Sequence, residues 1–141
     1  MKEFPERHAV SRARFFLQKA TECPADRRRD FEAYLEACII FARAAIHRAK
    51  SQFEAQANWR PWWDGLLSNP SVDFFRTERD WILKEAPPKI GQVIRLGDPP
   101  ADYATDLYYF EGPEVPAVVT LQRHLNELER IIADAEGRFA S

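Results

Sequence analysis

Residues 69–85 read NPSVDFFRTERDWILKE and predict the helix around which the rest of the chain is organised. Asn69 is a favourable N-cap, Pro70 suits the first turn, and prolines at 87 and 88 follow the end. At about 100° per residue, one arc of this helix is apolar and consists of Val72, Phe75, Ile82 and Leu83. Arg79 falls in the middle of that arc, and Arg76 lies at its edge. Because an unpaired guanidinium is costly to bury, Arg79 is expected to reach an acidic partner, a wet groove or an anionic ligand.

Three more helices are predicted, at about 5–20, 27–57 and 116–138, from apolar residues at three- and four-residue spacing. The stripe of the second one is rich in small residues, so another helix can approach it closely. That stripe consists of Phe31, Leu35, Cys38, Ala42, Ala45, Ala49 and Phe53. Together with 69–85, these segments predict a mainly α fold, an up-and-down bundle of four main helices.

Two segments between the helices have a different character. Residues 58–68, NWRPWWDGLLS, predict a bend with one short helical turn after Pro61. Their three tryptophans either cap the core or mark a contact surface, and capping is the favoured interpretation. Residues 90–96 and 103–110 are rich in β-branched and aromatic residues, which predicts a small β-hairpin or extended insertion at about 89–112. The whole chain, 1–141, is interpreted as one domain.

Composition narrows the class of protein. The chain has 141 residues, 45% hydrophobic and 30% charged, without an apolar run of membrane-spanning length or a secretion signal at its start. We therefore expect a cytoplasmic protein without a membrane partner. Neither the two cysteines nor the isolated histidines, His8, His47 and His124, follow metal-ligand spacing, so no metal or cofactor is expected. The histidines are interpreted as surface residues, and Cys38 as a core residue rather than a nucleophile.

Charge is distributed unevenly along the chain. Residues 1–60 carry 12 Lys and Arg against 8 Asp and Glu, whereas residues 61–141 carry 8 against 14. This asymmetry can hold two halves of a fold together or create one basic face, but the net charge of −2 is not that of a strong duplex binder. Arg27, Arg28 and Arg29 are interpreted as a solvated run in preference to a phosphate contact at a helix start.

The order of these segments resembles the HEPN superfamily of small helical bundles, many of which are metal-independent RNases of toxin–antitoxin and antiviral systems. The family motif is an arginine, a polar residue, three further residues and a histidine. The corresponding run here is Arg79-Asp80-Trp81-Ile82-Leu83-Lys84. The stretch YYFEG at 108–112, followed by VVTLQRHLNELERII at 118–132, is also similar to the last part of bacterial HEPN-like proteins.

This resemblance implies a homodimer in which Arg79 of both subunits faces a shared groove, lined also by Asp80, Lys84 and Arg76. In the family the arginine steadies a phosphate and the histidine handles a proton of the ribose. A lysine stands at position 84 instead, and its ordinary pKa near 10.4 keeps it protonated at neutral pH. The resemblance therefore implies a non-cleaving member that binds a nucleotide, RNA or a protein partner. Two alternatives remain open: a working RNase that uses another proton carrier, and a structural or partner-binding bundle with Arg79 in an internal ion pair.

Overall fold

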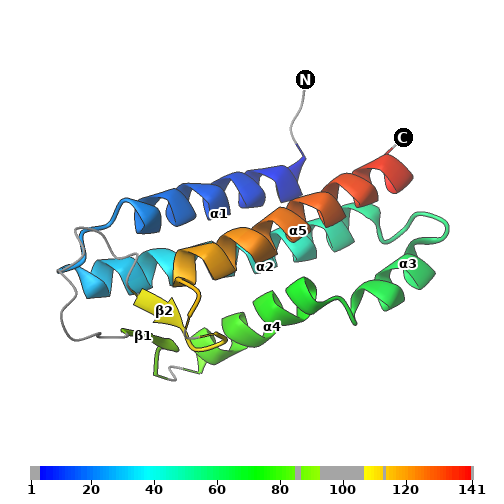
Figure 1. Cartoon of the computed structure of the whole chain (residues 1–141). Helices are drawn as coiled ribbons and strands as arrows, with labels where there is room; N and C mark the ends of the chain where they lie inside the picture. Colours follow the sequence, from blue (N-terminus) through cyan, green and yellow to red (C-terminus); the bar gives the residue numbers. More distant parts are fainter. Residues whose placement is uncertain (1–3, 85–86, 93–106, 113, 141) are drawn as a thin grey trace.

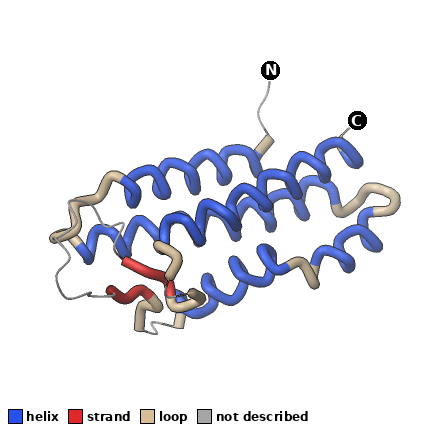
Figure 2. Tube along the Cα trace, in the orientation of Figure 1, coloured by secondary structure: helices blue, strands red, loops and turns tan. Residues whose placement is uncertain are grey.

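The computed structural model describes residues 4–84, 87–92, 107–112 and 114–140. It is a mainly α bundle with a small two-stranded antiparallel sheet, which confirms the predicted fold class (Figures 1 and 2). The helices are α1 (Pro5–Thr21), α2 (Arg28–Phe53), α3 (Trp59–Leu66), α4 (Pro70–Leu83) and α5 (Ala117–Phe139). None of the helices in these described ranges combines the length and apolar character needed to cross a lipid bilayer.

The core lies between α2 and α5, with α1 and α4 packed on either side of this pair (Figure 1). The small residues of the predicted α2 stripe are fully buried, so the neighbouring helices approach closely as expected. Cys38 is among them, and burial raises the pKa of its thiol to about 12. The interpretation of Cys38 as a core residue is therefore confirmed.

The end of the bundle is closed by a cluster of aromatic side chains. The segment after α2 turns through Asn58, whose φ of 68° lies in the left-handed region, and then forms α3, which is longer than the predicted single turn. Trp59 is buried against Phe53 and Phe139, and the indole N–H of Trp62 donates to Asp134 at 2.9 Å. These contacts confirm that the tryptophan-rich bend caps the core.

The predicted hairpin is present in part. Strands β1 (Ile90–Gln92) and β2 (Leu107–Tyr109) pair antiparallel, with Ile90 opposite Tyr109. The remainder of the predicted strands, within 93–106, lies outside the described residues. Arg28 donates to the carbonyl of Ile90 at 2.5 Å and so ties this sheet to the start of α2.

Ion pairs between α1 and α5 join the basic first half of the chain to the acidic second half. Arg7 of α1 pairs with Glu136 of α5 at 2.5 Å, and Arg14 pairs with Glu129 at 2.6 Å. Both pairs cross from the basic first half to the acidic second half. Part of the basic run at the start of α2 is also paired, since Arg28 contacts Glu32 and Arg27 contacts Asp30.

Candidate functional site

The buried face of α4 differs from the predicted one. The helix begins as expected, because the Asn69 side chain accepts hydrogen bonds from the amides of Ser71 and Val72. However, the residues that α4 buries are Ser71, Val72, Phe74, Phe75 and Glu78, while Leu83 is 59% exposed. At 100° per residue, this face is rotated from the predicted arc by roughly a fifth of a turn. The prediction that Leu83 belongs to the buried stripe was wrong.

This rotation moves Arg79 from the centre of the buried face to its edge. The Arg79 side chain is 40% exposed and forms an ion pair with Asp80, the next residue, at 3.3 Å. An internal ion pair with a glutamate of another helix is not found in the described part of the chain. Arg76 is exposed and pairs with Asp73, and Lys84 is an exposed residue at the C-cap. The four predicted groove residues therefore all lie on the accessible side of α4.

Basic side chains of α2 face this side of α4. Burial, together with the positive charges of Arg79 and Arg76, lowers the pKa of Arg43 below its ordinary value. The pKa of His47, one helical turn further on, is lowered first by burial of part of its ring and then by Arg43, Arg79 and Lys50. His47 is exposed, as expected for a surface histidine, and these neighbours favour its neutral form. We refer to Arg43, His47, Lys50, Arg76 and Arg79 as the cationic face.

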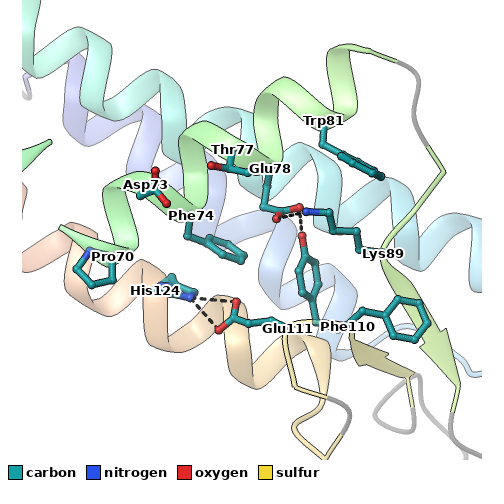
Figure 3. A pocket seen from close by; sticks show the side chains of 11 residues that line it. Pro70, Asp73, Phe74, Thr77, Glu78, Trp81, Lys89, Phe110, Glu111 and His124 are labelled. Carbon is teal, nitrogen blue, oxygen red and sulfur yellow. Dashed lines mark hydrogen bonds and ion pairs between the residues drawn. The ribbon is translucent and has the colours of Figure 1, made fainter. Parts of the chain in front are cut away.

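The opposite side of α4 borders a pocket of about 610 Å³ between α4, the start of α5 and the hairpin (Figure 3). Its walls are aromatic and acidic. The lining residues include Phe74, Trp81, Tyr109, Phe110, Asp73, Glu78, Glu111, Lys89 and His124. Three carboxylates against one ammonium make this pocket unsuited to a phosphate group.

Glu78 connects the hairpin to the bundle from inside this pocket. It is buried on α4, accepts a hydrogen bond from the hydroxyl of Tyr109, and forms an ion pair with Lys89 at 2.8 Å (Figure 3). Burial and the carboxylate of Glu78 raise the pKa of Tyr109, which keeps its hydroxyl protonated as a donor. The Lys89 ammonium also lies 4.6 Å from the ring centroid of Trp81. These contacts explain why a glutamate occupies the buried face of α4.

His124 forms the other polar centre of the pocket. Only 8% of it is exposed, so its interpretation as a surface residue was wrong. Its ring stacks on Phe74 with centroids 4.0 Å apart, Nδ1 lies 2.9 Å from the Ser71 hydroxyl, and Nε2 lies 3.4 Å from Glu111. Burial lowers its pKa, which favours a neutral ring that accepts from Ser71 and directs its N–H towards Glu111.

Sequence patterns could not identify this pocket, because its residues come from three segments without a shared motif. The only local signal is the polar pair Ser71 and Glu78, seven residues apart on one side of an otherwise apolar helix face. Within the described residues, no group of three or more histidine, cysteine or acidic side chains is gathered in a way that could hold a metal ion. Comparison of this chain with protein-family models, with curated proteins and with solved structures found no match.

Proposed function

We propose that this chain is a HEPN-like, non-cleaving protein that binds the phosphate groups of RNA or a nucleotide on the cationic face. The observation that carries this proposal is the excess of positive charge where α2 and α4 meet. Four basic side chains, Arg43, Lys50, Arg76 and Arg79, lie there, and among the described residues only the carboxylates of Asp73 and Asp80 form ion pairs with them. Like charges held this close repel each other, and a bound phosphate would relieve that repulsion.

The exposure of these side chains favours a ligand that lies along the surface. Arg79 is half-exposed and Arg76 is exposed, so both guanidinium groups can contact phosphate oxygens in a bidentate manner. Their carboxylate partners, Asp80 and Asp73, are also exposed, and such surface pairs contribute only about 0–1 kcal/mol. The arginines can therefore exchange these partners for a phosphate at little cost.

Lys84 does not supply the proton chemistry of the family motif. It is an exposed residue at the C-cap of α4. This position supports binding without cleavage. Asp80 and Lys84 would then border the phosphate site, and Arg79 would be its central contact.

The binding test uses a fluorescently labelled single-stranded RNA and a nucleotide competitor, measured by fluorescence anisotropy at several salt concentrations. Arg79→Ala is expected to weaken RNA binding about tenfold. It should also reduce the slope of the logarithm of the binding constant against the logarithm of the salt concentration by roughly the amount expected for one phosphate contact. Arg60→Ala, which removes an exposed arginine of α3 paired with Asp64, is the matched control and should have a much smaller effect. Equal losses in the two variants, or no binding by the wild type, would overturn the proposal.

A second candidate function, a metal-independent RNase, is favoured by one observation. His47 lies near Arg79, and its lowered pKa favours a neutral ring that could accept the proton of a ribose hydroxyl. The assay is incubation of total RNA in metal-free buffer with the wild type, Arg79→Ala and His47→Gln. Cleavage lost in both variants would support the enzyme, and an intact RNA sample with the wild type would exclude it.

We also propose a homodimer, which the family resemblance implies, in which Arg79 of both subunits faces one groove. Two copies of the cationic face would double the positive charge that an RNA strand meets. A protein partner in place of RNA remains an alternative, and it would be recognised by acidic side chains that suit the same arginines. An acidic peptide that competes with RNA for the wild type but not for Arg79→Ala would favour that alternative.

A further inference from the structure

The pocket between α4, the start of α5 and the hairpin lies apart from the cationic face, and the proposed function does not use it. Its volume of about 610 Å³ is that of a site for a small organic molecule. Aromatic rings form much of its wall (Figure 3). Phe74 and Tyr109 are buried, whereas Trp81 and Phe110 are 38% and 64% exposed. These rings offer flat apolar surface to a ligand that enters from solvent.

The two exposed rings are held in place by contacts within the chain. The indole N–H of Trp81 donates to the carbonyl of Pro87 at 2.6 Å. The ring of Phe110 packs so closely on Gly91 that a Cβ atom at position 91 would overlap it. Because these rings are already positioned, a ligand that binds between them loses little affinity to the ordering of side chains.

The pocket already accommodates one organic cation, the side chain of Lys89. Its ammonium lies 4.6 Å from the ring centroid of Trp81 and 2.8 Å from the carboxylate of Glu78. An aromatic face combined with a carboxylate is how proteins bind ammonium and guanidinium groups. The chain's own lysine therefore shows which kind of charge these walls stabilise.

The hydrogen-bonding groups inside the pocket favour a ligand that donates. Tyr109 and Lys89 both donate to Glu78, which is buried. The ring of His124, neutral because burial lowers its pKa, directs its N–H towards Glu111. These donors are thus turned towards carboxylates of the protein itself. A bound molecule meets acceptors more readily than donors here.

Two exposed carboxylates supply those acceptors. Asp73 belongs to α4 and Glu111 follows β2, and Figure 3 shows them on two sides of Phe74. Asp73 pairs with Arg76, and Glu111 pairs with Arg123 at 2.6 Å. Both arginines are exposed and neither lines this pocket, so the pairs are weak surface interactions that can open towards a ligand.

We propose that this pocket binds a small organic cation in which a flat apolar group carries an amidinium, guanidinium or ammonium group. The apolar group lies against Trp81 and Phe110, and the cation donates hydrogen bonds to Asp73 and Glu111. This site does not depend on phosphate binding by the cationic face. Either site can be lost by substitution while the other is kept.

The test uses three probes of nearly the same shape: benzamidinium, which is positively charged, benzamide, which is neutral, and benzoate, which is negatively charged. Binding is followed by two-dimensional NMR of the indole N–H groups, and Trp81→Phe assigns the signal of Trp81. The other three tryptophans, Trp59, Trp62 and Trp63, belong to α3 and serve as internal controls. Benzamidinium is expected to shift the Trp81 signal in a saturable manner and to bind about tenfold more tightly than benzamide. Benzoate should bind more weakly than either.

Substitution of the exposed carboxylates then separates charge from shape. Asp73→Asn and Glu111→Gln should each weaken benzamidinium binding about fivefold, and the double variant should bind benzamidinium no better than benzamide. Asp64→Asn removes an exposed carboxylate of α3, paired with Arg60, and is the matched control that should leave the affinity unchanged. The same spectra show that each variant is folded.

Three results would overturn the proposal. They are a Trp81 signal that benzamidinium does not shift, an affinity for benzamidinium no greater than that for benzamide, and full affinity in the double variant. RNA binding measured on the same double variant is expected to persist, because Arg79 is intact. Loss of RNA binding in Arg79→Ala with benzamidinium binding retained would show that the two sites are independent.

Discussion

Glu6 offers the sharpest test of the energetics of this fold. It lies in the first turn of α1 with 0% of its surface exposed, and within the described part of the chain neither carboxylate oxygen has a hydrogen-bond partner. The nearby carboxylate of Glu136 is already engaged by Arg7. Burial, and to a lesser degree the charge of Glu136, raises the pKa of Glu6 above its ordinary value of 4.5. We therefore expect Glu6→Met, which has a side chain of similar length without polar oxygens, to stabilise the protein at neutral pH.

The size of the gain follows from two opposing contributions. An unsatisfied buried polar group costs about 1–3 kcal/mol, which the methionine variant recovers. A carboxylate in the first turn of a helix contributes about 0.3–1 kcal/mol through the helix dipole, which the variant loses. The net gain is about 1–2 kcal/mol, or a few degrees in Tm for a chain of this size.

The pH dependence provides an independent check on the same side chain. The pKa of Glu6 is higher in the folded state than in the unfolded state. Between these two pKa values, the folded state therefore holds a proton that the unfolded state has lost. The contribution of Glu6 to stability is therefore fully present below pH 4.5 and is lost as pH rises through the folded pKa. Glu6→Gln removes the titration and should flatten this part of the curve.

The assay is urea unfolding monitored by circular dichroism from pH 4 to pH 8. Glu22→Met, at the exposed end of the same helix, is the control and should change stability by less than about 0.5 kcal/mol. A Glu6→Met variant less stable than the wild type at pH 7, or an unchanged pH profile in Glu6→Gln, would refute the reasoning.

Four further substitutions or reactions test the packing. Phe75→Ala should destabilise by about 3–5 kcal/mol in urea unfolding, because the ring is fully buried. Glu78→Gln should cost about 1–3 kcal/mol and should increase amide exchange in β1 and β2, since the ion pair with Lys89 is lost. Leu83→Gln should change stability by less than about 0.5 kcal/mol, because this leucine is exposed. Cys38 should react with a thiol reagent only on unfolding, since its buried thiol has a pKa of about 12.

The helices were predictable because their signals are local. Asn69 caps α4 as the sequence indicates, and the regular stripe of α5 continues for its whole length. The tryptophan-rich segment was correctly placed over the core, although α3 is longer than a single turn. The positions of Glu78 and His124 were not predictable in this way, because each is buried by partners from distant segments.

What the sequence alone determined is which residues form helices and which side of α2 and α5 faces the core. These choices follow from the spacing of apolar side chains and from caps within a few residues. The tertiary structure decided how far α4 is rotated, and so whether Arg79 is buried or accessible. The physical reason is that Ser71 and Glu78 can be buried only when His124, Tyr109 and Lys89 satisfy their polar atoms, and only the fold brings those partners together.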